Sequence, residues 1–215
     1  MTTLNKNDKA YWSAYYAENK APNQPSDFGS HIFINHLTKM KPAKTLEFGF
    51  GNGRDLMFFN KCGVETDGIE LAPGSAARLS KEIPNGEIIE GSFADDSLLT
   101  HKENYYDLVY SRFTLHSVDK ETEKLALKNA YRLLTKGGTL AIEARTIYDE
   151  FNGRGEKVSD NEWIYEDHYR RFLDPGETAM AVQNAGFRIV TMEVSGDFAV
   201  YKDQRPVCLR IIAQK

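Results

Sequence analysis

Three glycines at alternate positions form the part of the chain best suited to hold a ligand. They are Gly49, Gly51 and Gly53, and they stand between an apolar run and a helical pattern. Alternate glycines let the backbone turn tightly and let a ligand approach where any Cβ would collide. Glu70 follows Glu47 by 23 residues, near the spacing of about 20 residues at which a carboxylate reaches a ribose diol. The pattern indicates a nucleoside site, although a tight turn without a ligand uses the same glycines.

A third segment extends the nucleoside site. Ser92 and Phe93 directly follow a short apolar run. A polar side chain at this place can read the edge of an adenine, and a ring can cover its face. A nicotinamide dinucleotide fits less well, because its fingerprint places the third glycine one residue later, where Arg54 stands. A ligand without phosphates makes no such demand.

Two residues beyond later apolar runs could act on a second substrate. His116 could remove a proton from a hydroxyl or ammonium group. The alternative is a histidine that packs or caps the next helix. Arg145 ends another apolar run, and a guanidinium there could bind a carboxylate or phosphate through two parallel hydrogen bonds.

The segment 145–173 is too long for a plain crossover connection, and we interpret it as a substrate lid. Aromatic rings provide walls for a binding site, and arginines provide donors for an anion. One arginine could instead pair with a nearby carboxylate of the lid while the rings only pack. The lid residues expected to bind the substrate are Tyr165, His168, Tyr169, Arg170 and Arg171.

Short apolar runs alternate with helical patterns, and these elements must position the candidate residues. Strands are expected over 44–49, 64–70, 87–90, 106–111, 138–144, 187–194 and 207–213, and helices over 53–62, 74–82, 120–134 and 174–185. The alternation indicates a parallel sheet covered by helices on both faces, with ligands at the carboxyl ends of the strands. Only a loop joins the last two strands, so they must be antiparallel neighbours. Lys202 in that loop is interpreted as a solvated lysine.

This pattern resembles the class I methyltransferases that depend on S-adenosylmethionine (SAM), from residue 44 to the end of the chain. The resemblance implies an α/β, Rossmann-like, seven-stranded mixed sheet with helices on both faces and an antiparallel last strand. It also implies SAM as cofactor, S-adenosylhomocysteine as product, and no metal. The cofactor-binding residues implied are Glu47, Gly49, Gly51, Gly53, Glu70, Leu71, Ser92, Phe93 and Ser111.

The aromatic segment 1–30 resembles the entry segment of methyltransferases that modify small molecules or cell-envelope sugars. We expect it to form a cap on a single domain spanning 1–215, with the lid at 145–173. Tyr15, with Tyr11 or Tyr16 as alternatives, could close over the amino-acid end of SAM. The helical spacing of these rings also fits simple packing against the core.

Composition and charge narrow the class of protein. The chain has 215 residues and a net charge of −4, with 41% hydrophobic and 27% charged residues. The acidic balance disfavours nucleic acid as a partner. No apolar run is long enough to span a bilayer, the N-terminus has no signal-peptide pattern, and two cysteines are too few for a disulfide framework, so a cytoplasmic location is expected.

The sequence therefore predicts an enzyme that moves a methyl group to oxygen or nitrogen of a small, anionic acceptor such as a sugar, sugar phosphate, phosphonate or carboxylate. His116 is the catalytic candidate, and a monomer or homodimer is expected. The alternatives are a SAM-binding pseudoenzyme that senses or scaffolds, and a protein or nucleic-acid methyltransferase. A carboxylate acceptor needs no base, whereas a hydroxyl acceptor does.

Overall fold

The computed structural model describes residues 4–18, 22, 24–39, 43–201 and 203–215. Lys202 and parts of the cap segment 1–30 lie outside the described residues. The helices are α1 (Leu4–Glu18), α2 (Asp27–Asn35), α3 (Arg54–Lys61), α4 (Pro73–Glu82), α5 (Lys120–Leu133) and α6 (Pro175–Asn184), with short 3-10 turns at Leu37–Lys39, Thr100–Lys102 and Leu115–Ser117.

The strands form one large and one small sheet. The large sheet contains β1 (Lys44–Phe48), β2 (Glu65–Glu70), β3 (Ile88–Glu90), β4 (Tyr106–Arg112), β5 (Leu134–Arg145), β9 (Arg188–Ser195) and β10 (Cys208–Gln214), in the order β3-β2-β1-β4-β5-β10-β9. The last strand, β10, is antiparallel to both β5 and β9. The seven-stranded mixed sheet expected from the sequence is confirmed.

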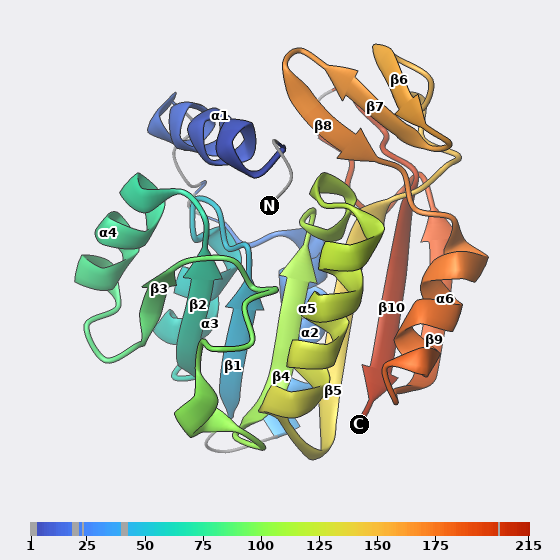
Figure 1. The fold of residues 1–215 in the computed structure, drawn as a ribbon. Coiled ribbons are helices and arrows are strands. Elements are labelled where there is room, and N and C mark those ends of the chain that lie inside the picture. Colours follow the sequence, from blue (N-terminus) through green and yellow to red (C-terminus); the bar gives the residue numbers. More distant parts are fainter. Residues whose placement is uncertain (1–3, 19–21, 23, 40–42, 202) are drawn as a thin grey trace.

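Helices cover both faces of the large sheet, with α5 and α6 in front and α2 and α3 behind in Figure 1. Alternation along β4 explains the two layers, because successive strand residues point to opposite faces. Val109 packs in the cluster that contains α5 and α6 side chains, whereas Leu108 and Tyr110 pack with Phe28 of α2 and Phe59 of α3. The buried apolar side chains hold the carboxyl ends of β1, β2 and β4 at one edge of the sheet.

The small sheet lies inside the segment 145–173. It consists of β6 (Glu156–Ser159), β7 (Glu162–Tyr165) and β8 (His168–Arg171), paired as antiparallel neighbours. The β7–β8 turn is made by Glu166 and Asp167, both with positive φ, as a two-residue hairpin requires. The sequence analysis predicted no strands here. Figure 1 shows this sheet and α1 above the carboxyl ends of the large sheet's strands.

Candidate active site

The glycine loop follows β1 and leaves no room for side chains. Gly49 has φ of +64°, and a Cβ there would lie 2.6 Å from Cγ2 of Thr114. Gly51 has φ of +57°, and a Cβ there would collide with the Tyr16 hydroxyl. L-residues with side chains rarely adopt this left-handed conformation. The loop therefore presents bare backbone at the end of the sheet, as the alternate glycines predict.

Glu70 is the last residue of β2, and its carboxylate is hydrogen-bonded both to the glycine loop and to the backbone just after β2. Its Oε2 accepts a hydrogen bond of 2.7 Å from the Gly51 amide, and its Oε1 accepts one of 2.9 Å from the Ala72 amide. Burial raises the pKa of Glu70, and the amide hydrogen bonds act in the opposite direction. Each carboxylate oxygen keeps a second lone pair for a ribose hydroxyl.

Glu47 lies in β1 beneath the loop and is also buried. Burial raises its pKa well above the ordinary value, and the charge of Asp55 adds to this effect. Its Oε2 has no hydrogen-bond partner within the described part of the chain. Buried polar atoms are usually satisfied, so an unsatisfied oxygen beside a bare glycine loop is a ready acceptor for a ligand.

A cavity of about 380 Å³ opens beside the loop, a size within the range of small-ligand sites. It brings together the predicted cofactor residues Gly49, Glu70, Leu71, Ser92 and Phe93. Phe93 stacks on Phe48 with 5.5 Å between ring centroids, which fixes its ring at the wall. The buried Ser111 at the end of β4 is not among the lining residues, and its Oγ has no hydrogen-bond partner in the described chain.

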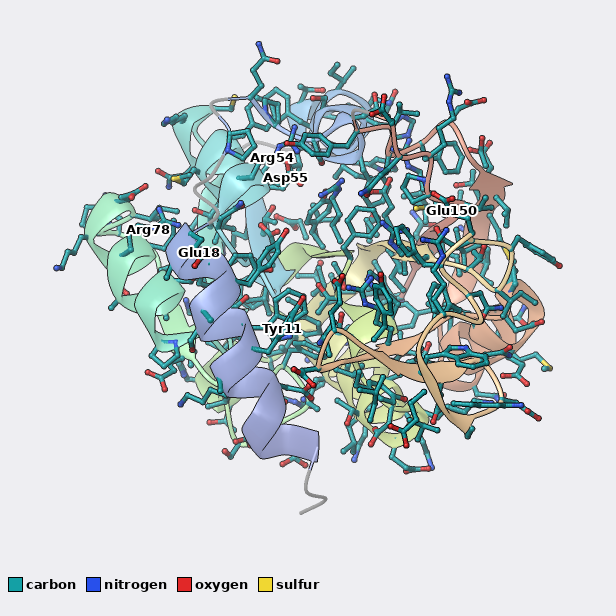
Figure 2. The ribbon with its side chains drawn as sticks, turned by 90° about the horizontal axis from the view of Figure 1, so that it is seen from above. Tyr11, Glu18, Arg54, Asp55, Arg78 and Glu150 are labelled. Atoms are coloured by element: carbon teal, nitrogen blue, oxygen red, sulfur yellow. The ribbon has the colours of Figure 1, made fainter. Side chains whose placement is uncertain are left out.

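Helix α1 also supplies residues to the cavity. Figure 2 shows α1 crossing the edge of the molecule that carries the strand ends, with Tyr11 on this helix. Tyr16 lines the cavity and covers Gly51, whereas Tyr15 is 43% exposed and lines no part of it. Of the three tyrosines expected as candidates to close over SAM, Tyr16 is therefore the one that lines the cavity, and Tyr15 is not. The other lining residues that were not predicted include Asp8, Trp12, Phe113, Thr114, Val118 and Asp119.

Asp8 lines the cavity, and its carboxyl group has a raised pKa. Burial raises its pKa from 3.8 to about 6, and the nearby charge of Asp119 adds to the shift. A raised carboxyl pKa destabilises the folded state as pH rises from 3.8 through about 6, because the folded state then disfavours the charge. Asp8→Asn is therefore expected to raise the melting temperature at pH values above 6 and to leave it unchanged below 4, as thermal unfolding across pH will show. An equal gain in melting temperature at both ends of the pH range would show that the buried charge of Asp8 is not the cause.

His116 lies on the 3-10 turn after β4. Its ring meets Phe113 edge to face at 5.5 Å, and its Nδ1 is buried without a hydrogen-bond partner among the described residues. Burial lowers its pKa well below 6.5, and the charges of Arg145 and Arg170 lower it further. The imidazole is therefore neutral near pH 7, and the same shift makes it a weaker base than an ordinary histidine.

Successive side chains of the lid strand β8 point into two different environments. His168 stacks on Tyr11 of α1 at 4.2 Å and meets Trp12 edge to face, so the lid and α1 touch. Burial lowers the pKa of His168 to about 3. Tyr169 points the other way and lines the cavity, where burial raises its pKa.

Arg170 shares its side of β8 with His168. Its guanidinium lies over the rings of Tyr165 at 5.4 Å and Phe151 at 5.9 Å. Its buried Nε has no hydrogen-bond partner in the described part of the chain. The predicted residues His116, His168, Arg170 and Tyr165 thus gather at one place.

Arg145 lies beside this group but is already paired. Its Nη1 donates to both carboxylate oxygens of Asp149 at 2.9 Å, and its guanidinium lies over the Phe151 ring at 5.0 Å. The arginine is held at the end of β5 as predicted. Its charge, however, is balanced within the protein.

The substrate-binding role expected of Arg171 is wrong in this geometry. Arg171 is buried, and its guanidinium donates to the carbonyls of Leu115 and Val118 and to Glu123 of α5 at 2.7 Å. Strand alternation turns it away from Arg170 and into the protein. The sequence analysis allowed one lid arginine to pair with a carboxylate, but the partner lies on α5 and not in the lid.

Breaking the Arg171–Glu123 pair should affect stability strongly. Arg171→Ala leaves the Glu123 carboxylate buried without a partner, and such changes destabilise by about 3–5 kcal/mol. Urea unfolding measures the loss. Arg205→Ala removes an exposed ion pair with Asp197 and is expected to change stability by about 0.5 kcal/mol or less. Equal losses in the two variants would show that the buried pair does not stabilise the lid.

Comparison with known proteins agrees with this architecture. Residues 46–142 match the family of methyltransferase domains. A phosphoethanolamine N-methyltransferase of Plasmodium falciparum is 31% identical over 104 residues, which cover 46% of this chain and 38% of that protein. The chain therefore spans well under half of the length of this curated relative.

Two solved structures share the fold at low sequence identity. A SAM-dependent methyltransferase of Methanosarcina mazei has a TM-score of 0.72 and 15% identity, covering 85% of this chain and 96% of that one. A Burkholderia thailandensis 1,6-didemethyltoxoflavin-N1-methyltransferase, solved with its substrate and S-adenosylhomocysteine, has a TM-score of 0.71 and 16% identity, covering 100% and 91%.

Residues 46–142 match the family of methyltransferase domains, and the large sheet has the strand order and the glycine loop expected of the class I methyltransferase fold. The expected fold is confirmed, and the family match agrees with the expected enzyme class and cofactor. Within the described chain, no three His, Cys, Asp or Glu side chains converge as a metal site, and no helix is long and apolar enough to cross a membrane.

Proposed function

We propose that this protein transfers a methyl group from SAM to oxygen or nitrogen of a small acceptor that carries a negative charge. The single observation that carries the proposal is the unpartnered Nε of Arg170, buried beside His116 and His168. Arg170 is only partly buried, but its Nε is buried without a hydrogen-bond partner, and an anionic group on the acceptor would satisfy it.

The cofactor side of the site fits SAM. Glu70 would bind the ribose hydroxyls, Ser92 with Phe93 would bind the adenine, and Tyr16 would cover the methionine part above the glycine loop. The unsatisfied oxygen of Glu47 gives the loop region an acceptor for a positively charged group. Bound SAM supplies an activated methyl group on a sulfonium, whose displacement leaves a neutral thioether.

The residues of the chain then have three tasks. Arg170 and Arg145 bind the anionic group and orient the acceptor, the rings of Tyr165, His168 and Tyr169 exclude water, and His116 accepts the proton at Nδ1. Alignment of the acceptor is the main requirement of an in-line displacement. The lid 145–173 and helix α1 would close the site from two sides, because Tyr11 of α1 stacks on His168 of the lid.

Calorimetric titration of the protein with SAM and then with small anions tests the proposal. We expect SAM to bind alone, and anionic compounds to bind to the complex with S-adenosylhomocysteine in the wild type but not in Arg170→Gln. Methyl transfer to such an acceptor, measured as S-adenosylhomocysteine release, would complete the assignment. SAM binding with no anion binding would favour a pseudoenzyme that only senses SAM, and methylation of protein or nucleic acid instead would also overturn the proposal.

A further inference from the structure

The arginines around His116 differ in whether the protein balances their charge. Arg112 pairs with Glu143 at 2.8 Å, Arg145 with Asp149 at 2.9 Å, and Arg171 with Glu123 at 2.7 Å. Arg170 has no carboxylate within ion-pair distance among the residues that the structure describes. Arg170 is hydrogen-bonded to the Tyr11 side chain, which is neutral and does not balance its charge. The exposed Glu166 at the β7–β8 turn raises the pKa of Tyr11 but forms no ion pair with Arg170 in the same set of residues.

Asp149 is held in place by more than Arg145. Its Oδ1 accepts from the Phe151 amide at 2.9 Å, and its Oδ2 accepts from the Val207 amide at 3.0 Å. The carboxylate is buried, so it cannot swing into solvent when a ligand binds. Arg145 therefore remains a hydrogen-bond donor whose charge is permanently balanced.

The two histidines add no positive charge near pH 7. Burial lowers the pKa of His116 well below 6.5 and that of His168 to about 3. The group formed by Arg145, Asp149, Arg170, His116 and His168 therefore carries one net positive charge, which is located on Arg170.

We propose that the acceptor site is matched to a monoanion, such as a carboxylate, sulfonate or phosphodiester, and that Asp149 is the residue that makes it reject dianions. This inference rests on the proposed function, because it assumes that the acceptor's charged group binds at Arg170. A dianion would bring one charge that no side chain of this group balances, beside a guanidinium that is already partly removed from water, and an unpaired charge there is unfavourable. Rejection through an unbalanced charge is a common source of specificity.

Two probes of the same shape and different charge test the inference on the unaltered protein. Benzenesulfonate and phenylphosphonate are both tetrahedral at the anionic group and carry the same ring. At a pH above the second ionisation of the phosphonate, they differ by one negative charge. Titration into the protein saturated with S-adenosylhomocysteine is expected to show benzenesulfonate binding about tenfold more tightly.

The variant Asp149→Asn raises the net charge of the site from one to two while keeping an oxygen that can accept hydrogen bonds. The ratio of the two affinities is expected to shift by about tenfold or more toward phenylphosphonate. Glu150→Gln is the matched control, because this neighbouring carboxylate is exposed and pairs with Arg154 instead (Figure 2). It should leave the ratio unchanged.

The outcomes separate this inference from the proposed function. If neither probe binds the wild-type complex, the anionic acceptor itself is disproved. If both probes bind and the wild type prefers phenylphosphonate, the site binds anions, but the proposed preference for monoanions is wrong. An equal shift of the ratio in Glu150→Gln would show that overall charge, and not Asp149, sets the preference. If Asp149→Asn does not fold, the wild-type ratio alone still decides the charge match.

Discussion

Replacing Glu70 by alanine is expected to weaken SAM binding by about hundredfold or more, which corresponds to about 3 kcal/mol. The change removes the carboxylate expected to hold the ribose. It also leaves the Gly51 and Ala72 amides without the oxygens to which they donate at 2.7 and 2.9 Å. Hydrogen bonds to a charged group each contribute about 1.5–3 kcal/mol, so the two effects combine into a large loss. Calorimetric titration with SAM measures it directly.

The controls for Glu70 separate binding from folding. Glu70→Gln keeps one oxygen acceptor and should bind SAM with an intermediate affinity. Glu82→Ala removes an exposed carboxylate that pairs with Arg78 on α4, and its affinity should stay within about twofold of the wild type. Unchanged affinity in a folded Glu70→Ala protein would contradict the placement of the ribose at the end of β2.

The large sheet was predictable because its signals are local and agree with one another. The apolar runs around Leu46, Val109 and Ile142 mark buried strands, and each is followed by a turn and a helical pattern. One boundary was less accurate. β5 begins at Leu134, directly after α5, and not after the turn expected at Gly137. Gly137 does have a positive φ, but its amide bonds to the carbonyl of Lys215, so β10 extends the pairing of this region.

The lid shows where local signals fail. β6, β7 and β8 are four residues each and mix charged side chains with apolar or aromatic ones, so no period of two marks them. Short strands of this kind form through their neighbours and through turns with positive φ, here at Asn161 and Glu166. Without the strand assignment, the sequence could not show that Arg170 and Arg171 point to opposite sides.

The cofactor residues were easier to identify than the substrate residues for a physical reason. Gly49, Glu70 and Phe93 follow strand ends that parallel pairing places at one edge, so sequence position determines spatial position. Tyr16 reaches the loop from α1, whose docking depends on contacts with β8 that have no sequence signature. Its helical neighbour Tyr15 has the same residue type, and only the rotation of the docked helix distinguishes the two.

His116→Ala is expected to lower kcat by about a hundredfold or more if the acceptor reacts through a hydroxyl or ammonium group, because general-base catalysis typically contributes about that much. The acceptor KM should change little, since Arg170 and not His116 binds the anionic group. Steady-state kinetics with each methylated acceptor found in the screen give both constants. His116→Asn keeps a polar side chain at this place without a base and is expected to lower kcat equally.

The pH dependence of kcat distinguishes a base from a residue that only packs. An ordinary histidine base would be protonated below pH 6.5, and kcat would fall there. Burial and the charges of Arg145 and Arg170 lower the pKa of His116, so its neutral form persists to lower pH and the wild-type kcat should remain level through 6.5. Arg145→Gln removes one of these charges and should move the acid limb of the profile upward. A profile that is level in every variant, with full activity in His116→Ala, would show that the acceptor atom is already an anion and that the transfer needs no base.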